Sequence, residues 1–109
     1  MMTQITFYRD HKGKPVGFQA KDHAGYAEEG QDIVCSAVSA LVINFLNSFE
    51  QLTEDAGTCR TSEDDAVIEF RVSGTCSEEG QILLDSLVLG ITNIESEYRP
   101  YIHVVFEEV

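Results

Sequence analysis

The feature that most constrains the fold is a long amphipathic helix pattern in the first half of the chain. Its apolar residues recur at three- and four-residue intervals: Val34, Val38, Leu41, Val42, Phe45, Phe49 and Leu52. This spacing places them on one face of an α-helix. Asp32 stands just before the pattern and is predicted to be the N-cap, because its side chain can accept a hydrogen bond from the first free N–H groups. The helix is predicted to end near Glu54, before Asp55-Ala56-Gly57.

Segments with strand character lie on both sides of this helix. Residues 11–15 contain Gly13 and Pro15 and supply turn chemistry for a hairpin between the first two segments. Strand patterns are read from alternation and from β-branched and aromatic content. They predict five strands, at residues 5–9, 16–20, 58–61, 66–72 and 101–106.

A second helix is predicted between the last two strands. Thr75 and Glu78 have the spacing of a capping box, with Thr75 as the N-cap. Gly80 and Gly90 weaken this helix locally, which predicts close packing at both positions. Its inner stripe is predicted to contain Leu83, Leu84, Leu87, Val88, Ile91 and Ile94.

The element order is therefore β-β-α-β-β-α-β within one domain that spans residues 1–109. Two helices each need an apolar surface to cover, and the most economical arrangement places both on one face of the sheet. The predicted class is α+β, with a mixed or antiparallel sheet and two helices on one face.

The net charge of −12, from 19 acidic and 7 basic residues, bears on the possible partners. Binding to nucleic acid phosphates needs the opposite sign, so direct recognition of DNA or RNA is disfavoured. A cationic partner would be attracted by long-range electrostatics. The alternative is that the charge only keeps a small protein soluble.

The cysteines and the apolar segments indicate the compartment. Cys35, Cys59 and Cys76 include no CxxC pair, and the three histidines are dispersed, so a structural metal site is not expected. Thiols in this number suit a reducing compartment. No apolar run is expected to reach transmembrane length, and the N-terminus lacks the regions of a signal peptide. We therefore expect a cytoplasmic protein with no membrane contact.

One stretch combines residues that can perform thiol chemistry. With Asp32 as N-cap, Cys35 would be the third residue of the helix, where free N–H groups and the helix dipole stabilise a thiolate. Cys35 lies roughly 70° from the centre of the apolar stripe, with Ser39 one turn further along, so the thiol is predicted at the edge of the buried face. His23 can accept the thiol proton and return a proton to a leaving amine. Gly25 and Gly30 in the loop at residues 21–31 would let the loop fold back or move over a substrate.

The same residues have a structural interpretation. A cysteine in an amphipathic helix is usually a small core residue, and His23 alone resembles a surface residue beside a turn. Cys76 serves as a control, because the capping pattern also places it in the first turn of a helix. The histidine and the glycine-bearing loop are what distinguish Cys35, whereas Cys59 in a strand has only a structural interpretation.

The stretch from His23 to Ser39 resembles the signature of a known family. The residues that carry the resemblance are His23-Ala24-Gly25-Tyr26 and Gly30-Gln31-Asp32-Ile33-Val34-Cys35-Ser36-Ala37-Val38-Ser39. They are similar to the motif of the ribosomal-processing cysteine protease family Prp, and a looser similarity covers the whole chain.

The resemblance implies a bacterial, cytoplasmic, homodimeric endopeptidase that needs no metal or other cofactor. Its implied substrate is the precursor of large-subunit ribosomal protein twenty-seven, cut after an N-terminal extension that is hydrophobic, rich in aromatic residues and ends in paired phenylalanines. A lysine-rich precursor would also be attracted by the negative charge. The implied nucleophile is Cys35 and the implied acid/base is His23. Asp32 and Ser39 match further motif positions with supporting roles.

One position departs from the motif, because Asp22 stands where the family typically has glycine. A carboxylate beside the imidazole would raise the pKa of His23 if the two were close. Asp22 and Asp32 are both candidates to orient the histidine. Two other classes remain open. One is a non-catalytic ribosome-assembly or protein-binding module, and the other is a thiol-redox protein, which would lack a resolving cysteine nearby in the sequence.

Overall fold

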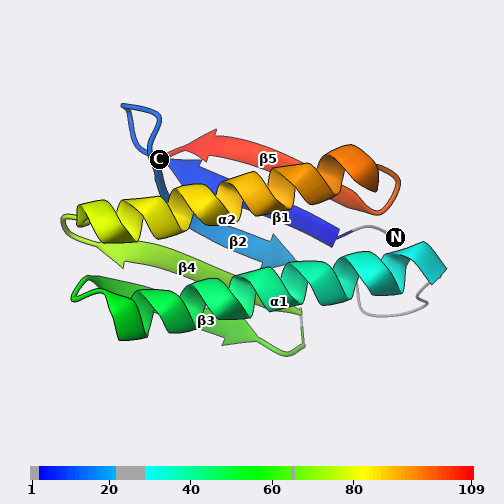
Figure 1. The fold of residues 1–109 in the computed structure, drawn as a ribbon, viewed down its shortest axis with the longest axis horizontal. Helices are drawn as coiled ribbons and strands as arrows, with labels where there is room; N and C mark the ends of the chain where they lie inside the picture. Colours follow the sequence, from blue (N-terminus) through cyan, green and yellow to red (C-terminus); the bar gives the residue numbers. More distant parts are fainter. Residues whose placement is uncertain (1–2, 22–28, 65) are drawn as a thin grey trace.

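The computed structural model of the chain describes residues 3–21, 29–64 and 66–109. Five strands and two helices follow in the predicted order β-β-α-β-β-α-β (Figure 1). The bounds are β1 Thr3–Arg9, β2 Pro15–Lys21, α1 Glu29–Leu52, β3 Ala56–Ser62, β4 Val67–Ser73, α2 Glu78–Glu97 and β5 Ile102–Glu108.

The strands form one mixed sheet in the spatial order β3-β4-β2-β1-β5. Strand β1 pairs in parallel with β5, and the other neighbouring strands are antiparallel. Both helices lie side by side on the same face of this sheet (Figure 1). The predicted α+β class, the mixed sheet and the shared helix face are therefore confirmed.

The core lies between the two helices and the sheet. Its centre is an aromatic cluster, in which neighbouring ring centroids lie 5.1–6.4 Å apart. Packing in such offset and edge-to-face arrangements adds to the burial of apolar area. The aromatic cluster consists of Phe7, Phe18, Phe45, Phe49 and Phe70. On α2, the core residues of the predicted stripe are Leu84, Leu87 and Ile91, and the stripe's other three members are partly buried and pack against the core.

The first helix begins earlier than its predicted N-cap. It starts at Glu29, so Asp32 is the fourth residue of α1 and the prediction of a cap there was wrong. An N-cap contributes only about 1 kcal/mol, and a glycine such as Gly30 costs a helix about 1 kcal/mol, so neither residue type decides a helix start by itself. The helix ends at Leu52, and the Thr53 hydroxyl donates to the carbonyl of Phe49 at 2.7 Å.

The second helix begins later than predicted. Its N-cap is Ser77, whose Oγ accepts a hydrogen bond from the N–H of Gly80 at 3.1 Å, so the assignment of Thr75 as cap was wrong. Ser77 is favoured because its hydroxyl and its N–H also donate to Asp55, at 2.5 and 3.1 Å. Cys76 consequently precedes the helix and does not lie in its first turn. Asp55 follows α1 in the sequence and ties that turn to the start of α2.

The two glycines of α2 pack closely, as predicted. Gly80 is buried, and a methyl group on it would meet Asp55, Cys76 and Phe49. A methyl group on Gly90 would lie 3.0 Å from the Leu41 side chain of α1. The helices therefore approach each other closely at Gly90, whereas Gly80 contacts the end of α1 and the Asp55 turn.

The expectation that no apolar run reaches transmembrane length was wrong. Asp32–Leu52 is a 21-residue segment that contains an 18-residue window with a mean hydropathy of 1.6, so it is long and apolar enough to cross a membrane by length and composition. The core helix of a soluble protein passes the same test. In this fold, five apolar side chains of the segment belong to the buried core: Val34, Val38, Val42, Phe45 and Phe49.

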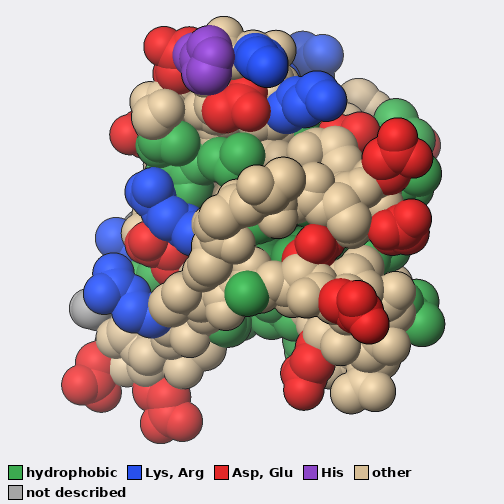
Figure 2. All heavy atoms as spheres, turned by 90° about the vertical axis from the view of Figure 1, so that its left-hand side faces the viewer, with side chains coloured by type: hydrophobic (Ala, Val, Ile, Leu, Met, Phe, Trp, Pro, Cys, Tyr) green, Lys and Arg blue, Asp and Glu red, His purple; other side chains and the backbone are tan. Residues whose placement is uncertain are grey.

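Charged side chains are distributed unevenly over the fold. Neither the 24 residues of α1 nor the 20 residues of α2 include a lysine, arginine or histidine. Charges of both signs gather at the β1–β2 hairpin and the end of β5, at the end of the sheet shown in Figure 2. There the N–H groups of Lys14 and Lys12 donate to Asp10 Oδ1 at 3.0 and 2.9 Å. These hydrogen bonds hold the pKa of the Asp10 carboxyl below its usual value.

Candidate functional site

A pocket opens between α1 and the end of the sheet where β1 begins and β2 ends. It encloses about 360 Å³ of empty space, including its open mouth. The part of this space that water can occupy is about 60 Å³, well below the volume of small-ligand sites, which suits a single side chain better than a whole ligand. The described residues that line it are Thr3, Ala20, Lys21, Cys35, Val38, Ser39, Val42, Ala66 and Ile68.

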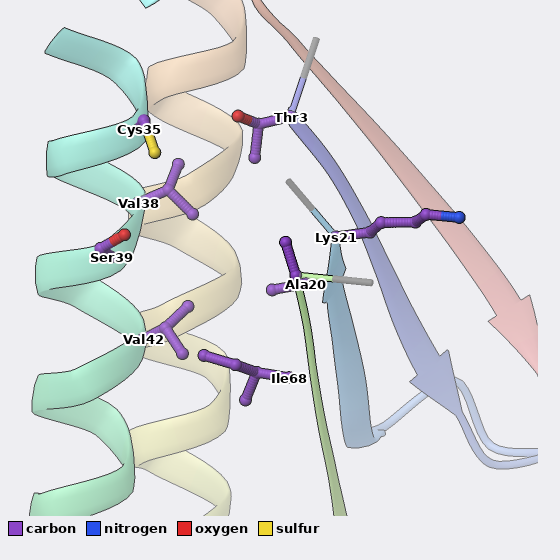
Figure 3. A pocket seen from close by; sticks show the side chains of 9 residues that line it. Thr3, Ala20, Lys21, Cys35, Val38, Ser39, Val42 and Ile68 are labelled. Carbon is purple, nitrogen blue, oxygen red and sulfur yellow. The ribbon is translucent and has the colours of Figure 1, made fainter. Parts of the chain in front are cut away.

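Cys35 and Ser39 occupy one wall of the pocket, one helical turn apart (Figure 3). Cys35 is half-buried and Ser39 is exposed, whereas Val38 between them is in the core. The prediction that the thiol lies at the edge of the buried face is therefore confirmed. A thiol in this position is open to solvent on one side and contacts an apolar cavity on the other.

The pocket lining is mostly apolar, and Thr3 and Ser39 add hydroxyl groups to it. Val38 and Val42 of α1 face Ala20 and Ile68 of the sheet, as Figure 3 shows. Thr3 lies across from Cys35 at the start of β1 and is buried. An apolar side chain placed here would leave water and contact mostly apolar side chains, which favours its binding. The chain that carries it would pass close to the Cys35 thiol.

Lys21 is the one basic residue among the described pocket-lining residues. Its side chain points away from α1 and from Cys35 (Figure 3). It pairs with Gln4 and Val67 in neighbouring strands, which places it on the sheet face opposite the helices. Lys21 therefore contributes to the pocket near its backbone, and its charge is not directed at the thiol.

The remaining predicted site residues differ in how far the structure describes them. Asp32 is exposed on α1 and is not among the described residues that line the pocket. Gly30 lies within α1, and the last three residues of the predicted loop at residues 21–31 belong to this helix. His23, Gly25, Tyr26 and Asp22 lie outside the described residues.

The position of Cys35 along α1 changes the electrostatic argument for its reactivity. Cys35 is the seventh residue of the helix and not the third. The N–H groups without an intrahelical partner are the first four, and the dipole effect is concentrated in the first turn. Stabilisation of a Cys35 thiolate must therefore depend more on a neighbouring side chain than the sequence indicated.

The two other cysteines lie away from this pocket. Cys59 is exposed on β3, and partial burial of its thiol raises its pKa. Burial also raises the pKa of Cys76, and the charge of Asp55 adds to that effect, with the thiol 3.8 Å from the Asp55 carboxylate. Both thiols are thus disfavoured as thiolates at neutral pH.

Sequence reasoning missed the sheet side of the pocket. Ala20, Ala66 and Ile68 were assigned to strands without a role in a site, and Thr3 was assigned to no element. The available signal was Ala20, a small residue at an inward position of a strand that carries Phe18 at its neighbouring inward position. Across the part of the chain that the structure describes, no three His, Cys, Asp or Glu side chains come together as a metal site.

Comparison with known proteins gives one consistent family. The sequence model of the family described as cysteine protease Prp matches residues 2–103. A relative from Bacillus subtilis strain 168, named ribosomal processing cysteine protease Prp, is 28% identical over 107 residues, covering 94% of this chain and 96% of the relative. A relative of the same name from Staphylococcus aureus Mu50 is 26% identical and covers 97% and 100% of the two chains.

Solved structures show the same fold. The crystal structure of the ribosomal processing protease Prp from S. aureus with a substrate peptide superposes with a TM-score of 0.90 at 24% identity, covering 97% of this chain and 100% of that chain. The crystal structure of SMU.848 from Streptococcus mutans superposes with a TM-score of 0.88 at 29% identity, and both chains are covered completely.

Proposed function

Because the chain belongs to the cysteine protease Prp family, we propose that Cys35 is its nucleophile and His23 its acid/base. The observation that carries this proposal is the position of Cys35. Its thiol lies in the wall of an apolar pocket, open to solvent, while Cys59 and Cys76 lie elsewhere with raised thiol pKa values. A peptide whose side chain fills the pocket would have its carbonyl carbon close to Cys35.

In the proposed reaction, His23 accepts the proton of the Cys35 thiol, and the thiolate attacks the carbonyl carbon of the scissile bond. The imidazolium then gives the proton to the departing amine, and an acyl-enzyme remains. Water, deprotonated by His23, attacks the thioester and releases the acid product and the Cys35 thiol. Since Cys35 lies beyond the first turn of α1, the imidazole is the main proposed stabiliser of the thiolate.

Supporting roles are proposed for five further residues. Ser39 lies one turn from Cys35 on the same pocket wall, where its hydroxyl can contact the substrate backbone. Asp32 is a candidate to orient His23, an alternative to Asp22. Gly25, Tyr26 and Gly30 are proposed to belong to the substrate-binding segment between β2 and Cys35.

The proposed substrate is the precursor of large-subunit ribosomal protein twenty-seven, with its hydrophobic N-terminal leader. Relatives named ribosomal processing protease and a relative crystallised with a substrate peptide support this assignment. The pocket's apolar lining also suits a hydrophobic leader. A cytoplasmic location and a homodimer are part of the same proposal, and analytical ultracentrifugation tests the latter.

The decisive experiment incubates the ribosomal protein precursor with the purified chain and determines the new N-terminus by mass spectrometry. We expect loss of the leader with the wild type and with the matched control Cys76→Ala. Cys35→Ala and His23→Ala should leave the precursor intact while retaining wild-type circular dichroism spectra. Cleavage that persists in Cys35→Ala would contradict the proposal.

The net charge of −12 adds a kinetic expectation. A lysine-rich precursor would be steered toward the helix layer, which contains no basic residue. The cleavage rate at low substrate concentration should therefore fall as ionic strength rises from about 0.05 to about 0.5 M. A rate indifferent to salt over this range excludes electrostatic steering.

A further inference from the structure

The pocket beside Cys35 exists because the side chains beneath it are small. On the helix-facing side of the sheet, residues paired across strands form rows. One row crosses the aromatic cluster and contains Phe106, Phe7, Phe18, Phe70 and Cys59. The next row toward the pocket contains Val104, Ile5, Ala20, Ile68 and Thr61.

Ala20 is the small residue in the second row. It pairs with Ile5 on one side and with Ile68 on the other, and it follows Phe18 on the same face of β2. A phenylalanine side chain fills the row at Phe18, whereas Ala20 contributes only a methyl group. The sheet therefore leaves a depression at Ala20.

The facing helix does not fill this depression. Above the aromatic row, α1 presents Phe45, whose ring lies 5.7 Å from Phe18 and 5.2 Å from Phe70 between centroids. Above Ala20, α1 presents Val38 and Val42, and Figure 3 shows these valines facing Ala20 and Ile68. Short side chains on both layers produce the pocket, because protein interiors are otherwise filled to close packing.

We propose that Ala20 is the specificity-determining residue of this enzyme. Its methyl group forms the floor of a subsite that receives one large apolar or aromatic side chain of the peptide substrate, next to the scissile bond. This inference rests on the proposed function, since it takes Cys35 as the nucleophile. Beyond the proposed function, it identifies Ala20 as the residue that limits the size of the substrate side chain.

The turn between β3 and β4 supplies a further wall. Ala66 lines the pocket with φ of +51°, a left-handed conformation that is uncommon for residues other than glycine. The alanine keeps that wall short as well. Ala20 pairs with Ile68, and Ala66 stands two residues before Ile68 in the chain, so two pocket-lining neighbours of Ile68 carry only a methyl group.

The test uses peptides that differ only in the residue on the acyl side of the scissile bond, either Phe or Ala. Wild-type enzyme should cleave the Phe peptide with the higher kcat/KM. In Ala20→Val, two added methyl groups fill the floor. The ratio of kcat/KM for Phe over Ala should then fall by about 10- to 100-fold, since one methylene in an apolar pocket changes discrimination by roughly 10–200-fold.

Ala56→Val is the matched control. Ala56 is also a strand alanine, but it is exposed and pairs with Ser73 at the far end of β3 from Ser62. This variant should keep the wild-type ratio. If Ala20→Val does not fold, Val38→Ile narrows the same pocket by one methylene from the opposite wall and should lower the ratio in the same direction.

An unchanged Phe-to-Ala ratio in a folded Ala20→Val enzyme would overturn the inference while leaving the proposed function intact. If wild-type enzyme cleaves neither peptide, the proposed function fails, and the subsite is then tested by the affinity of the protein for a peptide. Isothermal titration calorimetry with the peptide ending in Phe should then give weaker binding to Ala20→Val than to wild type. Equal affinities in that experiment also overturn the inference.

Discussion

Replacing Gly80 by alanine should destabilise the fold, although alanine is the better helix former. Gly80 is the third residue of α2, and its buried α-carbon faces the turn after α1. An added methyl group would overlap the Asp55 carboxylate and lie 2.8 Å from the Cys76 sulfur and 3.2 Å from Phe49. The overlap with Asp55 and the 2.8 Å approach to Cys76 are closer than any real contact, so neighbouring groups must move.

The magnitude follows from the contacts that would be lost. Asp55 accepts hydrogen bonds from the N–H and the hydroxyl of Ser77, at 3.1 and 2.5 Å. Hydrogen bonds to a charged group contribute about 1.5–3 kcal/mol, and overpacking a core position costs about 1–3 kcal/mol. The gain in helix propensity is at most about 1 kcal/mol. The net expectation is a loss of about 1.5–5 kcal/mol in the free energy of unfolding.

Gly90→Ala is the matched control within the same helix. Its methyl group would meet only the end of the Leu41 side chain, at 3.0 Å, and that side chain can change rotamer. Its free energy of unfolding should therefore stay within about 1 kcal/mol of wild type, with the propensity gain offsetting the contact. Urea unfolding followed by far-UV circular dichroism measures both variants. Equal stabilities of Gly80→Ala and Gly90→Ala would refute the reasoning.

Two further predictions concern ionisation. Iodoacetamide at neutral pH should label Cys35 at least about tenfold faster than Cys59 or Cys76, because the thiol pKa values of the latter two are raised. Mass spectrometry of the digested protein measures the labelling rate of each cysteine. Equal labelling rates would contradict a reactive Cys35. The pKa of the Asp10 carboxyl is lowered, chiefly by the hydrogen bond from the Lys14 N–H. The stabilisation that the ionised Asp10 gives the β1–β2 hairpin is therefore complete above pH 3.8, the ordinary pKa of the carboxyl, and is lost as the pH falls through the lowered pKa. The Lys14 amide chemical shift in NMR spectra should titrate below pH 3.8, and a midpoint above that value would be inconsistent with the hydrogen bonds.

The outcome of the sequence predictions depended on how local each pattern was. The apolar period of α1 and the alternation in β4 identified these elements, because the period depends only on which residues face the core. The caps were less predictable. Asp32 and Thr75 both have residue types that cap helices, but α1 starts at Glu29 and α2 is capped by Ser77. Ser77 is selected by Asp55, which lies 22 residues earlier in the chain.

The candidate site shows the same division. The sequence by itself determined the element order and the position of Cys35 at the edge of the apolar stripe, since both follow from helical and strand periodicity. Only the tertiary structure decided that Cys35 lies beside a pocket and that Ala20 forms the pocket's floor. The pocket depends on the register of β2 against β1 and β4 and on the helix above it. The size of a pocket depends on how side chains from different helices and strands pack against one another, so the periodicity of one element alone cannot predict it.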